Sequence, residues 1–288
     1  MVSSLLHRTG TIRGQALTAV VVLALLSGCS AAPQLSEPSA VLEEITYTEA
    51  MITLATRPGV QQRILMIQPE GKSKGILILF PGGDGTGHFK EGDRGFRLSN
   101  NFLVRSSHLF ALEGFTSAII DVPSDRPSGI SDGFRTSPEH LREMRAVVSF
   151  FAETYRQPVY FVGTSRGTLS AAYVATALEG ESVAGVVLTG AYEQIGSLPL
   201  ERIRYPVLFV HHRDDGCRIT PYAGARDLFR RVTTSRKKDF VTVIGGSPPL
   251  SKPCEALSTH GFLGKENEVV KAITDWLSGK PIFVTIGP

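Results

Sequence analysis

The pattern Gly-x-Ser-x-Gly, which places a hydroxyl between two small residues, occurs at Ser73, Ser131 and Ser165. Chance predicts roughly a quarter of one match at these glycine and serine frequencies, so the pattern alone identifies no site. Ser165 differs in context, because the apolar run 158–162 predicts a strand directly before it and the alanine-rich run 168–179 a helix directly after it. A serine on such a sharp strand-to-helix turn projects its hydroxyl from the sheet edge, where it can act as a nucleophile.

The other two serines lack this context. Ser73 lies in a polar turn before a predicted strand, and Ser131 lies in a loop rich in proline and serine with no strand leading into it. For Ser165, the simpler alternative is a serine that only caps its helix.

The elements that must position these residues alternate between apolar strands and helices. Strands are predicted at 45–53, 60–68, 75–80, 115–121, 158–162, 183–188, 206–211 and 240–244, and helices at 101–113, 138–155, 168–179, 221–232 and 266–277. The first two strands could form a hairpin. This alternation indicates an α/β fold, a mostly parallel sheet with helices on both faces. With no repeat and no shift of composition, residues 44–288 are predicted to form one domain.

A glycine-rich turn, Pro-Gly-Gly-Asp-Gly at 81–85, follows the third predicted strand. Together with the strand–turn–helix around the serine, it resembles the α/β-hydrolase family, in which such a turn helps to bind the oxyanion. The resemblance implies that the backbone N–H of Gly83, with Asp84 as the alternative, acts with that of Arg166. Family members often begin this turn with His-Gly, so Pro81 is a departure, but main-chain donors keep their role. The Arg166 side chain either attracts an acidic group or faces solvent.

The family carries its acid and its histidine after the serine, in that order, so the resemblance assigns them by position. Two adjacent aspartates, Asp214 and Asp215, follow the strand at 206–211, and the family's acid usually lies four residues after the position held here by His211. This spacing favours Asp215, with Asp214 as the alternative; both could instead only cap the next helix. His260 lies between the last predicted strand and the closing helix, where the family carries its catalytic histidine.

None of the other histidines combines the family's chain order with its place. His88 and His140 are predicted on the surface, His108 in a helix, and His211 and His212 at the end of a strand. The chain has no Cys-x-x-Cys or His-x-x-x-His spacing, no phosphate-binding glycine loop with lysine and no dinucleotide fingerprint. No metal and no cofactor are therefore expected.

Two cysteines flank the candidate acid and histidine. Cys217 lies two residues after Asp215, and Cys254 lies six residues before His260. In an exported chain these cysteines are expected to form a disulfide. The chain-entropy estimate for the loop that it closes is about 4 kcal/mol. A metal site that uses both cysteines and a nearby histidine is the rival interpretation, which their spacing does not favour.

Residues 1–28 resemble a secretory signal peptide. They contain two arginines, no acid and a mostly apolar run at 16–26, too short to span a bilayer comfortably. Leu-Ser-Gly-Cys at 26–29 resembles the lipobox of bacterial lipoproteins, which implies cleavage before Cys29 and a lipid anchor on it. By resemblance to proteobacterial lipoprotein sorting, Ser30, a residue other than aspartate after the cysteine, favours the outer membrane in a cell that has one. Residues 29–43, with two prolines and many small residues, are predicted to form a tether between the anchor and the domain. A plain signal peptide or an uncleaved anchor is the alternative.

The composition excludes other classes of protein. Hydrophobic residues make up 42% of the 288 residues and charged residues 20%, so a disordered chain is excluded. The formal net charge is +3 and no basic run is longer than the three residues 236–238, so no nucleic-acid partner is expected.

The sequence therefore predicts an α/β-hydrolase fold with little or no cap, because the link 190–205 is too short for a cap domain. A modest lid could come from this link or from 84–100. We expect a serine hydrolase that cleaves a small ester through an acyl-enzyme, anchored at the periplasmic face of the cell envelope. Peptidases, acyltransferases and non-catalytic binding proteins share the fold and are the alternatives.

Overall fold

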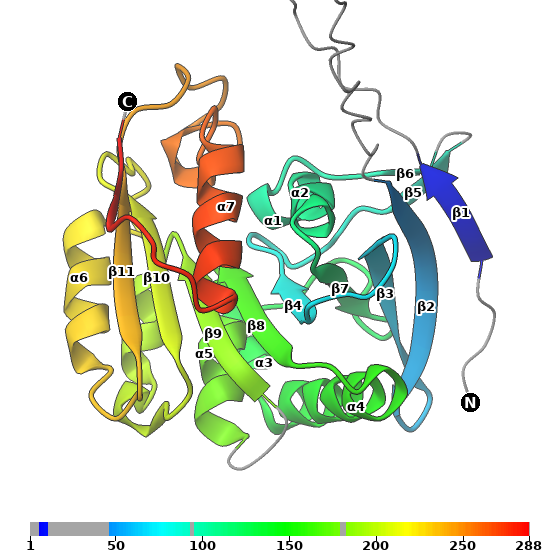
Figure 1. Cartoon of the computed structure of the whole chain (residues 1–288). Helices are drawn as coiled ribbons and strands as arrows, with labels where there is room; N and C mark the ends of the chain where they lie inside the picture. The colour runs from blue at the N-terminus through cyan, green and yellow to red at the C-terminus, as the bar shows by residue number, and fades with distance from the viewer. Residues whose placement is uncertain (1–5, 11–45, 93–94, 179–182, 288) are drawn as a thin grey trace, which may run out of the picture.

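The computed structural model describes residues 6–10, 46–92, 95–178 and 183–287. Its centre is a ten-stranded sheet in the order β1-β2-β3-β7-β4-β8-β9-β10-β11-β12 (Figure 1). The strands are β1 (Leu6–Gly10), β2 (Tyr47–Arg57), β3 (Val60–Pro69), β4 (Ile76–Phe80), β7 (Thr116–Pro123), β8 (Val159–Thr164), β9 (Val183–Thr189), β10 (Val207–His212), β11 (Lys238–Val243) and β12 (Thr285–Ile286).

The sheet changes from antiparallel to parallel at β7. The predicted hairpin is present as β2 and β3, and β3 pairs antiparallel with β7. From β7 to β12, every neighbouring pair is parallel. The carboxyl ends of β4, β8, β9 and β10 therefore lie at one edge, which is where open α/β sheets bind ligands.

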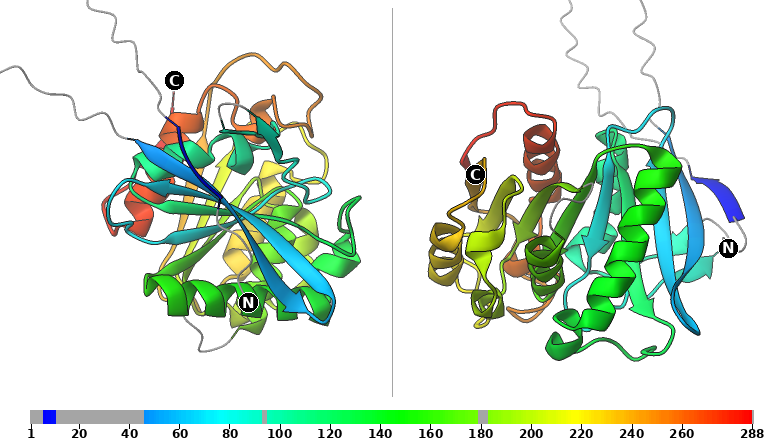
Figure 2. Two further views of the ribbon diagram at one scale, coloured as in Figure 1. Left: turned by 90° about the vertical axis from the view of Figure 1, so that its right-hand side faces the viewer. Right: turned by 90° about the horizontal axis from the view of Figure 1, so that it is seen from below.

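Helices cover both faces of the sheet (Figure 2). They are α1 (Phe102–Arg105), α2 (Ser107–Leu112) and α7 (Glu266–Leu277) on one face, and α4 (Pro138–Tyr155), α5 (Gly167–Ala177) and α6 (Tyr222–Arg231) on the other. Side chains of β4 alternate between the two cores, with Ile78 and Phe80 in one and Leu77 and Leu79 in the other. The predicted fold class is confirmed.

Several elements differ from the predictions. The helix expected at 101–113 is two helices that meet at Ser106, where the next hydroxyl, that of Ser107, donates to the Val104 carbonyl (2.7 Å), a local bond that competes with the helix backbone. Segment 84–100 contains a hairpin, β5 (Lys90–Gly92) and β6 (Gly95–Arg97). The link 190–205 contains two 3₁₀ turns, η1 (Glu193–Ser197) and η2 (Leu200–Arg202). The described residues contain no cap domain.

The N-terminal predictions are tested only in part. Residues of β1 lie within the predicted signal peptide and pair antiparallel with β2. Cys29 and residues 29–43 lie outside the described residues, so the lipid anchor and the tether stay predictions. Within the described ranges, no helix has the length and apolar character needed to cross a membrane.

Candidate active site

Ser165 occupies the tight turn between β8 and α5, with a φ of +52°. This left-handed conformation is unfavourable for a residue with a side chain and is concentrated at functional sites. Glycines on both sides allow the chain to turn: a Cβ added at Gly163 would lie 2.6 Å from the carbonyl oxygen of Gly167, and one added at Gly167 would lie 2.0 Å from that of Phe80. The predicted strand, turn and helix are all present.

The other two serines of the pattern have structural uses. The Ser73 hydroxyl donates to the Gly75 carbonyl (2.8 Å) and accepts from the Thr116 N–H (3.0 Å). The Ser131 hydroxyl accepts from the Phe134 N–H (3.2 Å) and caps the short helix α3 (Asp132–Arg135).

The glycine-rich turn after β4 packs directly on the serine turn. The Gly85 N–H donates to the Gly82 carbonyl (3.0 Å) and closes the turn, with Gly83 at a φ of +59°. A Cβ added at Gly82 would lie 3.0 Å from the Cβ of Ser165. Glycine therefore allows the turn to approach the serine this closely, because a larger residue would have to push its neighbours away.

Backbone N–H groups beside the serine are free. In the part of the chain that the structure describes, the N–H groups of Gly83, Asp84 and Arg166 have no hydrogen-bond partner. Unpaired backbone donors grouped at a turn and at a helix start can bind an anion.

The Arg166 side chain does not simply face solvent, one of the two expectations. Its Nε and Nη2 both donate to Oδ1 of Asp132, at 2.9 and 2.7 Å. The Tyr192 hydroxyl donates to the other oxygen of the same carboxylate (3.0 Å). The acidic group that Arg166 attracts is therefore one of the chain's own.

Asp215 and His260 meet across 45 residues of sequence. Nδ1 of His260 lies 2.9 Å from Oδ2 of Asp215. Both side chains are almost completely buried, whereas that of Asp214, the alternative acid, is 61% exposed and lies 3.5 Å from Arg213. When Nδ1 donates its proton to a carboxylate, the neutral imidazole keeps a lone pair on Nε2 and can act as a base.

Further donors hold Asp215 in its ionised form. The Cys217 N–H donates to Oδ1 (2.9 Å), and the Thr220 hydroxyl donates to Oδ2 (3.0 Å). Burial alone would raise the pKa of Asp215, but the hydrogen bonds from His211 and His260 outweigh it and hold this pKa well below its usual range.

His211 and Thr220 are site residues that the sequence analysis missed. Nδ1 of His211 accepts from the Ala191 N–H (3.2 Å), so its proton lies on Nε2. That Nε2–H points at the Thr220 carbonyl (2.9 Å) and lies 3.4 Å from Asp215. In the sequence analysis, His211 enters only as a spacing marker for the acid and as a rival to His260, and no local pattern singles out Thr220.

The end of β9 connects the two halves of the site. The Ser165 N–H donates to the Thr189 carbonyl (3.0 Å), and a Cβ added at Gly190 would lie 3.5 Å from Cε1 of His260. Among the described residues, neither the Ser165 hydroxyl nor Nε2 of His260 has a hydrogen-bond partner.

The predicted disulfide is present, with the Cα atoms of Cys217 and Cys254 4.4 Å apart. It ties the loop that carries Asp215 to the loop that leads into His260. Cys217 is buried, whereas Cys254 is exposed. No three His, Cys, Asp or Glu side chains within the described ranges lie together as a metal site would require.

One expectation about the rival histidines is wrong. His140 is buried rather than on the surface, because its ring packs against Phe80 and Phe134. Its helix turns this face towards the core. His88 is exposed. Nδ1 of His212 accepts from the Asp214 N–H (3.0 Å), so its Nε2–H donates to the Gly245 carbonyl oxygen (2.8 Å).

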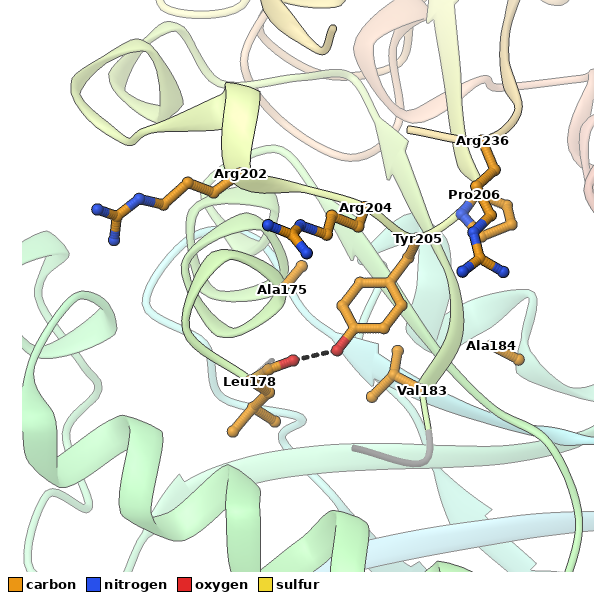
Figure 3. A pocket seen from close by; sticks show the side chains of 9 residues that line it. All are labelled: Ala175, Leu178, Val183, Ala184, Arg202, Arg204, Tyr205, Pro206 and Arg236. Carbon is orange, nitrogen blue, oxygen red and sulfur yellow. Dashed lines mark hydrogen bonds between the residues drawn. The ribbon is translucent and has the colours of Figure 1, made fainter. Parts of the chain in front are cut away.

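A cavity of about 510 Å³ lies at the other end of the strands from Ser165, beside the amino ends of β9 and β10 (Figure 3). It is lined by Ala175, Leu178, Val183, Ala184, Arg202, Arg204, Tyr205, Pro206 and Arg236. None of these residues is a nucleophilic serine or cysteine, a histidine or a carboxylate, so this cavity is not the candidate active site.

No protein-family model matches the chain, and no curated protein matches it. Solved structures do. A dienelactone hydrolase from Anabaena variabilis has a TM-score of 0.59 and 15% identity, over 81% of this chain and 98% of that one. A cold-adapted esterase from an Arctic intertidal metagenomic library has a TM-score of 0.54 and 16% identity, over 80% and 94%.

A third similar structure is XC6422 from Xanthomonas campestris, described as an α/β serine hydrolase without a lid. Its TM-score is 0.56 at 16% identity, over 82% of this chain and 96% of that one. At such identities a structural likeness speaks for the fold. The sheet order, the helices on both faces and these likenesses together show that the chain has the α/β-hydrolase fold.

Proposed function

We propose that the protein is a serine hydrolase that cleaves an ester through an acyl-enzyme. The observation that carries this proposal is the grouping of three features at one sheet edge. These are Ser165 on its strained turn, free backbone donors beside it, and the buried Asp215–His260 pair across the end of β9. The hydrolases and esterases among the similar structures support the same chemistry.

In the proposed reaction, Oγ of Ser165 attacks the ester carbonyl carbon while Nε2 of His260 takes the hydroxyl proton. Asp215 keeps the Nδ1–H tautomer and stabilises the imidazolium. The N–H groups of Gly83, or alternatively Asp84, and of Arg166 bind the oxyanion. The leaving alkoxide takes the proton from Nε2. Water, deprotonated by the same histidine, then releases the carboxylic acid and restores the serine.

The proposed substrate is a small ester. No cap covers the described carboxyl edge, and a long acyl chain would have little to bury it there. Peptide amides and acyl transfer remain the alternatives on this fold, and a paired panel of esters and peptide amides separates them.

The decisive test is Ser165→Ala. The variant is expected to lose ester hydrolysis and labelling by a fluorophosphonate while its circular dichroism is unchanged. Ser73→Ala and Ser131→Ala are matched controls that keep both. Loss of activity in a control but not in Ser165→Ala would move the nucleophile, and a wild type that is neither labelled nor active would favour a binding protein.

The location of the protein at the cell envelope is part of the proposal. It rests on the apolar run at 16–26 and the lipobox that ends at Cys29. Cys29→Ser is expected to release the protein from membranes. Equal membrane retention of this variant, with the mass of an unlipidated chain, would reject the anchor.

A further inference from the structure

Residues 129–135, which contain the unused Ser131 pattern, pack against the glycine-rich turn. The Ile130 N–H donates to the Asp84 carbonyl (2.8 Å), and a Cβ added at Gly129 would lie 2.7 Å from the Cβ of Asp84. The same segment forms α3, which carries Asp132 at its start and Arg135 at its end. The segment therefore contacts the turn at both of its ends.

Arg135 lies beneath the turn and is 1% exposed. Its Nη2 donates to the carbonyls of Pro81 (3.4 Å) and Gly83 (3.2 Å), and its Nη1 donates to the Ser170 hydroxyl in α5 (3.1 Å). Burial, helped by the nearby Arg166, lowers the pKa of Arg135 to about 10, so the guanidinium stays charged at neutral pH. A buried cation thus joins the turn to the helix that follows the serine.

These contacts set the direction of the turn's N–H groups. The C=O and N–H of one peptide plane point in opposite directions. Holding the carbonyls of Pro81 and Gly83 therefore fixes the N–H groups of Gly82 and Asp84, and the bond from Gly85 to the Gly82 carbonyl fixes that of Gly83.

The other end of α3 holds the second donor. Asp132 binds the Arg166 side chain through two N–H groups and is itself held by the Tyr192 hydroxyl. Because the free N–H of Arg166 belongs to the same residue, this ion pair limits how the start of α5 can move.

We propose that α3 positions both oxyanion donors. Arg135 is the positioning residue for the glycine-rich turn: it orients the Asp84 N–H directly, and it orients the Gly83 N–H by holding the peptides on both sides of the Gly82–Gly83 peptide. Asp132 is the positioning residue for Arg166. This inference rests on the proposed function, because it assumes that an oxyanion forms beside Ser165. Arg135 and Asp132 act through the backbone groups they hold and need not touch the substrate.

The test measures kcat and KM of Arg135→Lys and Asp132→Asn on a short p-nitrophenyl ester, per active site titrated with a fluorophosphonate. A lysine keeps the charge but cannot bridge both carbonyls and Ser170, so kcat is expected to fall about 10²-fold, the scale for a misplaced or missing oxyanion donor. For Asp132→Asn the expected fall is about 10-fold. KM should change by less than about twofold.

An arylboronic acid provides the second readout, because its tetrahedral adduct places an oxygen where the oxyanion forms. Its inhibition constant is expected to rise in step with the loss of kcat. Arg231→Lys is the matched control, since Arg231 also donates to two backbone carbonyls, those of Gly196 and Leu198, and none of its hydrogen bonds in the described structure involves the turn or α3. This variant should lose stability at most and keep kcat.

Unchanged kcat per titrated site in both α3 variants would overturn the inference, as would a rise in KM with normal kcat. If Arg135→Lys does not fold, Asp132→Asn still decides whether α3 acts on the donors, because the Asp132 side chain is partly exposed and its replacement disturbs the core less. A wild type without activity or labelling would instead reject the proposed function, so the two failures are distinguishable.

Discussion

The two halves of the candidate site are held by different kinds of contact. In the serine half, backbone packs on backbone: Gly82 lies against Ser165, and Gly167 lies against the Phe80 carbonyl. In the acid–histidine half, side chains on two loops meet, and the disulfide joins those loops. The serine turn therefore requires residues without a Cβ at Gly82 and Gly167. The acid–histidine half instead requires particular side chains, the Asp215–His260 pair and the two disulfide cysteines.

The largest expected effect is on turnover and comes from a substitution in the acid–histidine half. Asp215→Asn should lower kcat by about 10⁴, because a neutral amide neither enforces the Nδ1–H tautomer of His260 nor stabilises the imidazolium. Asp214→Asn is the control and should keep near-normal turnover, since its side chain is exposed. Measuring kcat of both variants on one ester decides between the adjacent residues, and a large loss at Asp214 alone would reverse the assignment.

The disulfide comes next. Replacing Cys217 and Cys254 by serine should lower the free energy of unfolding by about 4 kcal/mol, from the lost constraint on the unfolded chain. Urea should abolish activity at a lower concentration than it unfolds the sheet, because the two loops separate first. If thiol counting finds both cysteines reactive in the unreduced native protein, the bridge is absent.

Adding a single methyl group at Gly167 tests the close backbone packing of the serine half. Gly167→Ala should destabilise the fold by about 3 kcal/mol, although alanine normally favours a helix, because the new Cβ would overlap the Phe80 carbonyl. In Gly133→Ala the added Cβ has no atom within 3.4 Å, so its unfolding free energy should stay within about 1 kcal/mol of the wild type. Equal effects in chemical denaturation would contradict the proposed contrast.

The smallest effect concerns pH. The pKa of Asp215 is lower in the folded protein than in the unfolded chain, so the unfolded chain takes up its proton first as the pH falls. Stability from this group is complete above about pH 5 and declines below about pH 4, by about 1.4 kcal/mol per pH unit. Urea unfolding of wild type and Asp215→Asn between pH 6 and 3 measures it; a constant difference would refute the depressed pKa.

The two halves were also unequally visible in the sequence. The Ser165 turn could be predicted from a short stretch of sequence, because its strand, glycines and helix are consecutive. The helices at 138–155 and 266–277 could be predicted from the periodicity of their apolar residues. Asp215 and His260 could be assigned only through the resemblance, since 45 residues separate them.

Other features gave no local signal. Helix α3 has four residues, too few for a periodic pattern, and Arg135 binds a carbonyl 54 residues away. His140 sits among charged residues, and only the packing of α4 shows that it faces the core. A contact between distant residues is a property of the fold, so single-sequence patterns cannot contain it.

The φ of +52° at Ser165 lowers the stability of the folded protein, yet the proposed activity needs a serine in this position. A left-handed conformation costs a residue with a side chain about 1 kcal/mol, and glycine adopts it freely. The glycine variant at position 165 would thus combine greater heat resistance with no nucleophile. Laboratory evolution that selects for thermal survival alone would drift towards that inert protein, and only a screen that also demands turnover would retain the serine.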